Sequence, residues 1–440
     1  MSSAELSRRV VITGVGLVSP LGNTTDSLWD GLISQRSGAR DYDLFHWDSV
    51  STRYAAQATE FTGNIADFGN LEKDQKKMIR KALKLMCRET RMGVAAAQAS
   101  LQDAGINLGN HTPDRSGCIF GTDYMLTLPD DFISGVQACA GDDGQFAYDR
   151  WGSEGLAKVT PLWLLKYLPN MSASHVAIYN DLRGPNNSLT LREAAANMSV
   201  GEAFFTIARG SADMMVVGAT GTRIQPMNAI HAMQQEELAN GDFCAAEASR
   251  PFDRDRSGMV LGEGAGAVVL EELQTALNRN AQIYGEVVAR ASSTVLSRQS
   301  VSDRTTALKN VLLRTLKDAG LRPEQVGHIH AHGVSTRSGD RDEAQAIHSV
   351  FGKRAEPCPV TAAKSYFGNL GAGSGMVEII ASLLACRHGV LFPIRNYQNA
   401  DPDCPIEPAL TDQLPPGDNF VNLSVTPQAQ AAAILVRAFT

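Results

Sequence analysis

The sequence predicts a layered α/β protein built from two similar halves. Apolar strand-like runs alternate with amphipathic helical segments, which is typical of sheets covered by helices on both faces. One pentapeptide also appears twice, as Leu101-Gln-Asp-Ala-Gly105 and as Leu316-Lys-Asp-Ala-Gly320. Each copy closes a helical stretch and precedes a strand and a glycine-rich corner, so we expect a whole α/β half to be duplicated.

The predicted elements follow in order along the chain. Strands are expected at 10–13, 117–122, 214–217, 265–270, 326–332 and 432–436. Helices are expected at 74–87, 90–104, 194–209, 306–319, 340–350 and 376–387. Residues 123–165 are less regular and rich in aromatic side chains, which indicates an insertion over one face. We therefore expect an N-terminal half at 1–255, containing this insertion, and a C-terminal half at 256–440.

Composition excludes several classes of protein. The 440 residues are 43% hydrophobic and 20% charged, which is ordinary for a globular chain and sufficient for a large core. A net charge of -7 argues against a nucleic-acid-binding surface. No run of eighteen apolar residues predicts a membrane span, and Met1–Arg9 carries no signal-peptide core. We expect a cytoplasmic protein without membrane or nucleic-acid partners.

Neither a metal nor a cofactor is expected. The seven cysteines are odd in number, scattered and without Cys-x-x-Cys spacing, which favours a reduced protein without structural zinc. His328, His330 and His332 alternate and would share one face of a strand, a spacing that zinc could use, but a buried strand is the preferred interpretation. The glycines at 14–16 and 262–266 complete neither a dinucleotide fingerprint nor a P-loop, so close backbone packing is expected there.

Four segments carry a resemblance to a known family. Residues 9–22, 249–266, 331–340 and 364–371 resemble, respectively, the opening, a long central motif, the first histidine motif and the lysine-plus-second-histidine motif of β-ketoacyl-ACP synthases. The likeness extends from about residue 8 to residue 439. It implies a thiolase-like fold of duplicated halves in a five-layer αβαβα architecture, and a dimer.

The resemblance also implies a chemistry that this chain has partly lost. The family joins an acyl chain to malonyl-ACP, using a cysteine at a strand-to-helix turn and two histidines. Counting from Gly184-Pro185 places Glu193 where the cysteine is expected, and a carboxylate cannot hold a thioester. His332 and Lys364 are retained, but Asn369 stands at the second histidine position and cannot transfer a proton near neutral pH. The glycine-rich loop expected near the C-terminus is replaced at 422–430.

Two of these features have competing interpretations. Glu193 should be buried and partnered, with Lys364 and His332 as the candidate partners and a structural or regulatory role preferred over a decarboxylating base. The basic run 73–81 is a solvated helix face on charge alone. Because the family docks its acidic carrier protein on a similar segment, the resemblance makes Lys76, Lys77 and Arg80 a candidate docking patch.

The preferred hypothesis is a catalytically degenerate synthase, similar to chain-length-factor subunits, that pairs with an active ketosynthase in type II polyketide, polyene or fatty-acid-like biosynthesis. Acyl carrier protein is the further expected partner. The family's architecture implies that residues 185–190 lie at the subunit interface and that 123–140 approach the partner's acyl tunnel. One alternative is a malonyl-ACP decarboxylase or a ketosynthase with altered chemistry. The other is a non-catalytic homodimer that binds acyl-ACP or acyl-CoA.

Overall fold

The strands form two sets of five with the same internal order. A computed structural model describes residues 8–42, 51–241 and 243–439. The first set is β1 (Val10–Val18), β4 (Ser116–Thr122), β5 (Asn186–Thr190), β6 (Met214–Thr222) and β7 (Leu261–Glu272). The second set is β8 (Gly285–Thr294), β9 (His328–His330), β10 (Pro359–Thr361), β12 (Asn419–Val425) and β13 (Gln430–Ala438). Short strand β3 (Tyr54–Ala56) pairs with β7, β2 (Arg40–Asp41) pairs with β3, and β11 (Glu407–Pro408) extends the second set.

The strand order demonstrates the duplication. The sets read β5-β4-β6-β7-β1 and β10-β9-β12-β13-β8, so each places its third, second, fourth, fifth and first strand side by side. The pairing senses also match, with two parallel pairings followed by two antiparallel pairings in each set. Strands β1 and β8 pair and join the sets. The predicted duplicated α/β fold is confirmed. Along the chain, the first set of strands ends with β7 and the second set begins with β8. The division of the chain at residue 255 stays a prediction.

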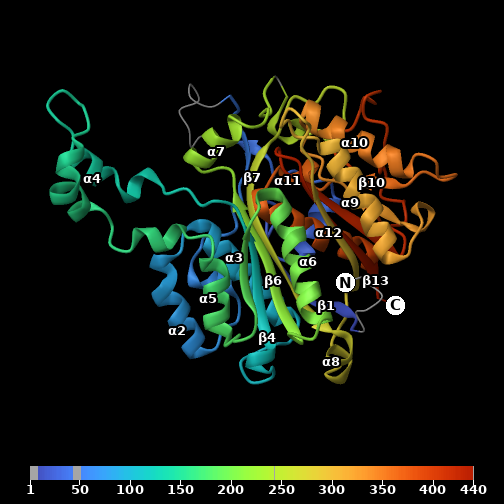
Figure 1. Cartoon of the computed structure of the whole chain (residues 1–440), viewed down its shortest axis with the longest axis horizontal. Coiled ribbons are helices and arrows are strands. Elements are labelled where there is room, and N and C mark those ends of the chain that lie inside the picture. The colour runs from blue at the N-terminus through green and yellow to red at the C-terminus, as the bar shows by residue number, and fades with distance from the viewer. Residues whose placement is uncertain (1–7, 43–50, 242, 440) are drawn as a thin grey trace.

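The helices complete a five-layer stack (Figure 1). Helix α3 (Arg88–Asp103) covers the outer face of the first set. Helices α6 (Ala195–Ala208) and α12 (Ser374–His388) contact strands of both sets and form the central layer. Helix α9 (Arg304–Ala319) covers the second set, and α10 (Arg337–Phe351) packs against α9. The remaining helices are α1 (Thr25–Ile33), α2 (Lys73–Ala82), α4 (Ile133–Ala138), α5 (Met171–Asn180), α7 (Pro226–Met233), α8 (Leu273–Asn278) and α11 (Lys364–Phe367).

The repeated pentapeptide ends two equivalent helices, α3 and α9. Gly105 and Gly320 have φ of 67° and 65°, the left-handed conformation that ends helices and that glycine adopts without strain. One predicted helix differs from the structure. The segment expected to be helical over 74–87 leaves the α-helix at Ala82, because Met86 and Cys87 take up extended backbone and bury their side chains.

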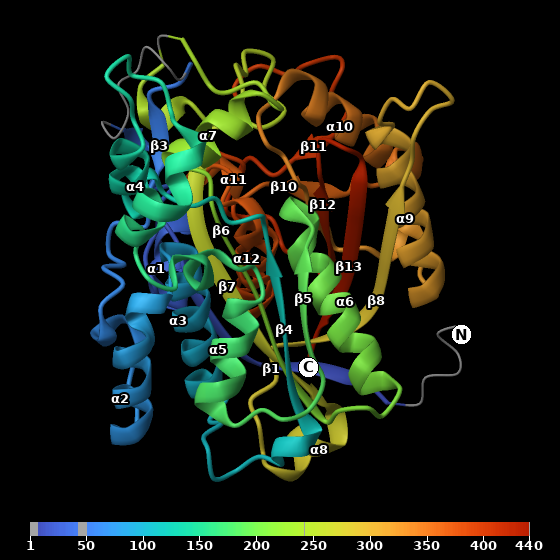
Figure 2. The same ribbon diagram turned by 60° about the vertical axis from the view of Figure 1, so that its left-hand side comes forward.

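Residues 123–165, here called the arm, connect β4 to the segment before α5. Figures 1 and 2 show the arm, with α4 near its tip, projecting from the same side of the body as α2, α3 and α5. An ion pair closes its base, where Lys166 Nζ lies 2.6 Å from Asp131 Oδ1. Tyr167 donates its hydroxyl to the other oxygen of Asp131 at 2.5 Å. Asp131, near the start of the arm, is therefore held against the two residues that follow its end.

Two further features limit the kinds of site the fold offers. All seven cysteines are free thiols. Among the residues that the structure describes, none of the helices has both the length and the apolar character needed to cross a bilayer.

Candidate functional site

Three adjacent parallel strands end at one edge of the first set, and a charged residue follows each of them. Asp123 comes directly after β4, Arg223 directly after β6, and Glu193 three residues after β5. Because the carboxyl ends of parallel strands meet, these side chains gather at the edge where open α/β sheets usually bind ligands. The Arg223 Nη2 atom lies 2.8 Å from Asp123 Oδ2 and 2.6 Å from Glu193 Oε1. One buried guanidinium thus joins the ends of three strands.

Glu193 lies on a strand-to-helix elbow, as the resemblance to the synthase motif implies. The chain leaves β5, adopts a positive φ of 54° at Arg192, and passes through a short 3-10 turn into α6. The elbow sits close against β4: a Cβ on Gly121 would lie 2.8 Å from the carbonyl carbon of Ala195. Glycine at 121 therefore permits the approach that brings Glu193 beneath the ends of β4 and β6.

The Glu193 carboxylate is ionised. Burial opposes its charge, but the guanidinium groups of Arg223 and Arg192 hold the pKa of Glu193 well below its ordinary range. Burial also opposes the charge of Arg223, whose pKa the carboxylates of Glu193 and Asp123 raise above its ordinary value. The prediction that Lys364 or His332 is the partner of Glu193 is wrong. The partner is Arg223, since Lys364 is held elsewhere.

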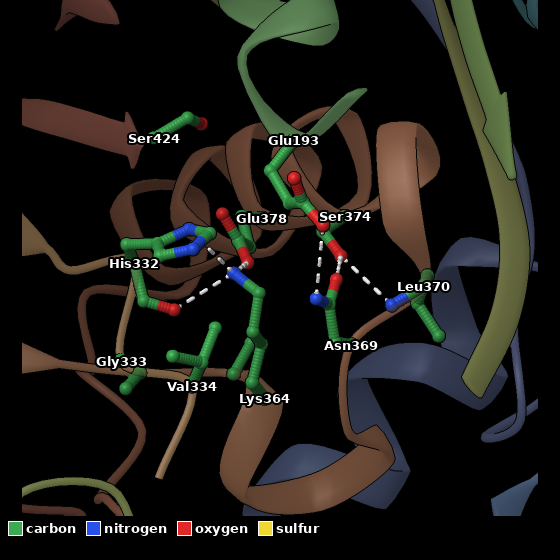
Figure 3. A network of polar contacts seen from close by, with 12 residues as sticks. Glu193, His332, Gly333, Val334, Lys364, Asn369, Leu370, Ser374, Glu378 and Ser424 are labelled. Atoms are coloured by element: carbon green, nitrogen blue, oxygen red, sulfur yellow. Dashed lines mark hydrogen bonds and ion pairs between the residues drawn. The ribbon is translucent and has the colours of Figure 1, made fainter. Parts of the chain in front are cut away.

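Lys364 belongs to a second cluster with His332 and Glu378, shown in Figure 3 beside Glu193 and Asn369. Its Nζ atom contacts Glu378, donates to the His332 carbonyl oxygen at 2.7 Å, and lies 3.3 Å from His332 Nδ1. The Glu343 carboxylate accepts the His332 backbone N–H at 2.6 Å. Burial, and then the Lys364 charge, lower the pKa of His332 well below its ordinary value. His332 is therefore a neutral imidazole at neutral pH.

Asn369 belongs to the first cluster, because it contacts Glu193. Its Oδ1 atom accepts hydrogen bonds from the Gly371 N–H at 2.9 Å and the Ser374 hydroxyl at 3.1 Å. These two donors fix the orientation of the amide, so its Nδ2 donates toward Glu193 Oε1 at 3.3 Å (Figure 3). The structure thus brings Glu193 and Asn369 together, and His332 and Lys364 together.

A row of polar side chains covers the elbow. Arg192 contacts Gln235 and donates to Gln428 Oε1 at 3.2 Å, and Gln428 lies on the tight turn between β12 and β13. Gln235 Nε2 in turn donates to His231 Nε2 at 2.6 Å, and His231 contacts Tyr124 in the arm. The sequence gives no motif for these residues. The one available signal is that Arg223, which sequence reasoning missed, directly follows a buried strand.

The candidate docking residues lie apart from this site. Lys76, Lys77 and Arg80 are exposed on α2, whose Gln75 and Ile79 are buried. Beside α2 is a hollow of about 670 Å³ between the base of the arm and the segment that leads into α3. Both basic and acidic side chains line it, among them Lys84, Arg91 and the paired Lys166 and Asp131.

The remaining histidines and glycines have structural surroundings. His328 Nε2 and His330 Nδ1 lie 3.0 and 2.8 Å from the Ser382 hydroxyl of α12. Within the part of the chain that the structure describes, no three His, Cys, Asp or Glu side chains are grouped to hold a metal. The Gly262 position allows close packing, because a Cβ there would lie 2.7 Å from the Phe367 carbonyl oxygen.

Comparison with known proteins agrees with this architecture. Residues 7–276 match the family model "Beta-ketoacyl synthase, N-terminal domain", and residues 284–398 match "Beta-ketoacyl synthase, C-terminal domain". The 3-oxoacyl-[acyl-carrier-protein] synthase 2 of Synechocystis is 33% identical over 404 residues, covering 91% of this chain and 90% of that protein. The corresponding synthase of Coxiella burnetii is 32% identical over 406 residues, covering 91% of both.

Solved structures extend the comparison. A β-ketoacyl synthase from Burkholderia phymatum has a TM-score of 0.83 and 25% identity, covering 98% of this chain and 100% of that one. The ishigamide ketosynthase/chain length factor has a TM-score of 0.80 and 25% identity with the same coverage. A type II polyketide ketosynthase solved with its acyl-carrier protein has a TM-score of 0.81, 24% identity and the same coverage, and shares the fold. With both domain models matched and full-length relatives above 30% identity, the chain belongs to the β-ketoacyl synthase family.

Proposed function

We propose that this protein is the non-condensing partner of an active ketosynthase and acts as a chain-length-factor-like subunit. The observation that carries the proposal is the ion pair between Glu193 and Arg223 at the elbow. A condensing enzyme of this family needs a thiolate at that turn to hold the acyl chain. Here the turn presents a carboxylate whose charge is already neutralised by a buried cation.

The second histidine position supports the same proposal. The Asn369 amide nitrogen faces Glu193 and the Met259 sulfur, and its oxygen binds Ser374 and the Gly371 N–H, so it offers neither a titrating group nor a free donor for a developing oxyanion. The scaffold motifs around it remain, including Lys364 paired with Glu378. Loss of chemistry beside a retained fold is what we expect of a subunit kept for pairing.

The exposed edge of the first sheet is the surface proposed for pairing. Strand β5 is the last strand of that set, and its five residues are exposed or half-buried. An unpaired edge strand is a template for another chain. The arm leaves the body from the neighbouring strand β4. A ketosynthase docked along β5 would therefore meet residues 123–140 as well, and these would shape its acyl tunnel.

The α2 patch is the proposed contact for acyl carrier protein. Carrier proteins are acidic, and Lys76, Lys77 and Arg80 present three cations on one exposed helical face. One similar structure is titled as a type II polyketide acyl-carrier protein in complex with its ketosynthase. Such a carrier would deliver chains to the heterodimer rather than to Glu193.

Co-expression with candidate ketosynthases tests the proposal. Native mass spectrometry should find a one-to-one heterodimer, and the heterodimer should make product when the ketosynthase alone does not. Enlarging small residues within 123–140 should shorten the product. A homodimer that no ketosynthase displaces would instead favour the acyl-carrier-binding homodimer.

Decarboxylation of malonyl-ACP is a second candidate, favoured by one observation. The neutral His332 beside Lys364 is retained, and such an imidazole can donate a hydrogen bond to a thioester carbonyl. Carbon dioxide release from malonyl-ACP by the pure protein, abolished by His332→Ala, would place this activity first.

A further inference from the structure

We propose that Glu193 is a positioning residue for the arm, which it reaches through Arg223 and Asp123. The inference rests on the proposed chain-length role. It assigns to the former nucleophile position the task of fixing the segment that approaches the partner's tunnel.

The first step is the shared guanidinium. Asp123, Glu193 and Arg223 have relative exposures of 4%, 3% and 1%, so little water competes for their charges. The Arg223 Nη2 atom contacts both carboxylates. Removing one partner from such a group leaves a buried charge uncompensated, which is far more costly than losing an exposed ion pair. The position of Asp123 therefore depends on the charge at Glu193.

The second step is what Asp123 does to the backbone. The ladder between β4 and β5 ends at Thr122, opposite Thr190. Asp123 is the next residue, and with it the arm begins. Its Oδ2 atom binds Arg223 while its Oδ1 atom accepts the Tyr124 N–H at 2.8 Å. One carboxylate thus ties the first peptide of the arm to the guanidinium and sets the direction in which the chain leaves the sheet.

A parallel route joins the same two segments. Arg192, the neighbour of Glu193, contacts Gln235, which binds His231, which contacts Tyr124. Two consecutive residues of the elbow are therefore connected to the first two residues of the arm. With two connections between the elbow and the arm, the contact between Glu193 and Arg223 is more than an isolated buried ion pair.

The charges of the group also balance. Glu193 and Asp123 supply two carboxylates, and Arg223 and Arg192 supply two guanidinium groups; Arg192 Nε lies 3.5 Å from Glu193 Oε2. A neutral thiol at residue 193 would leave Asp123 as the one remaining ion-pair partner of Arg223 among the described residues. Glutamate at residue 193, which replaces the nucleophile, thus also supplies the second carboxylate that binds Arg223.

Hydrogen–deuterium exchange of the arm tests this inference directly. Exchange of peptides spanning 124–131 is measured in the full-length protein, alone and bound to its partner ketosynthase. Arg223→Met should speed exchange there by about tenfold or more, because the base of the arm opens locally. Glu193→Gln, which keeps the shape and folds more readily, should give a smaller increase. Asp123→Asn combined with Glu193→Gln should have less than the product of the two separate effects, since both act through Arg223.

Arg279→Met is the matched control. Arg279 pairs with the buried Glu271 at 2.5 Å, near α8 at the opposite end of the sheet (Figure 1). Arg279→Met removes an arginine that is also paired with a buried carboxylate, although Arg279 is more exposed than Arg223, and it should leave exchange at 124–131 unchanged. If Arg223→Met and Glu193→Gln both leave that exchange unchanged, the positioning role is wrong, whatever the products are. Faster exchange accompanied by altered product lengths supports both proposals, and faster exchange with unaltered lengths supports the anchor while counting against the chain-length role.

Discussion

Asn369 donates its side-chain N–H to the Glu193 carboxylate, so the two residues that depart from the synthase pattern contact each other. Asn369 cannot turn away, because Gly371 and Ser374 hold its oxygen. Replacing Glu193 would take away the carboxylate that Asn369 Nδ2 faces, whereas replacing Asn369 would remove one donor from a carboxylate that Arg223 still binds. The two departures therefore behave as one matched pair.

Covalent chemistry should be absent from the elbow. Incubation with acyl-ACP or with a cysteine-directed ketosynthase inhibitor should leave no adduct on residues 184–203, as checked by peptide mass mapping. Glu193→Cys should acylate at least about a hundredfold more slowly than an active synthase, because Asn369 and the altered 422–430 turn still lack the second histidine and the oxyanion donors. An acyl group mapped onto the wild-type elbow would contradict this prediction.

Arg223→Met should destabilise the fold by about 3 to 5 kcal/mol, since it leaves Glu193 and Asp123 buried without their shared cation. Denaturant unfolding monitored by fluorescence gives the free energy of unfolding. Adding Glu193→Gln to this variant should recover part of the lost free energy of unfolding, because one of the two unpaired buried carboxylates is then neutral. A double variant no more stable than Arg223→Met would show that charge is not the cause.

Release of carbon dioxide from malonyl-ACP should be slight. Although the charge of Glu193 is balanced, Glu193 and Arg223 occupy the elbow where the malonyl group of a synthase substrate would lie. Radiolabelled malonyl-ACP provides the measurement, with His332→Ala as the control. Robust turnover that this control abolishes would reverse the ranking of the two proposed functions.

Charge reversal on α2 should weaken binding of acyl carrier protein. The triple variant Lys76→Glu, Lys77→Glu and Arg80→Glu should raise the Kd of the heterodimer for the carrier by about tenfold or more at low salt. The difference should shrink at high salt because exposed charges are screened. Lys309→Glu, on exposed helix α9, is the control. An unchanged Kd in the triple variant would remove the patch from the docking surface.

Acid should destabilise the protein in part through His328. Burial lowers the pKa of His328 to about 4, whereas an unfolded chain protonates histidine near pH 6.5. The unfolded state therefore binds more protons between these values, and the free energy of unfolding falls as the pH falls. Relative to His328→Gln, wild type should lose about 2 kcal/mol between pH 7 and pH 5. Parallel pH profiles for the two proteins would contradict the shift.

The fold could be predicted from the sequence because its signals are local. Apolar runs gave the strands, and the glycines after Asp103 and Ala319 ended two equivalent helices. The place of Glu193 also followed from spacing along the chain. Its partner did not. Arg223 reaches Glu193 because β5, β4 and β6 are neighbours in the sheet, with β4 in the middle. The spacing of residues along the chain does not predict this strand order. Lys364 was expected at Glu193 but pairs with Glu378, which the central helix α12 brings beside it.

The turn between β12 and β13 bears on how this protein arose. Gln428 on that turn reaches Arg192, while Arg223 comes from β6 and Asn369 from the segment before α12. Glu193 and Asn369 both depart from the synthase pattern and lie on separate segments, as does the altered 422–430 turn. A single substitution is therefore not expected to recover a condensing enzyme. On the proposed chain-length role, such a protein would keep its dependence on an active ketosynthase over evolutionary time.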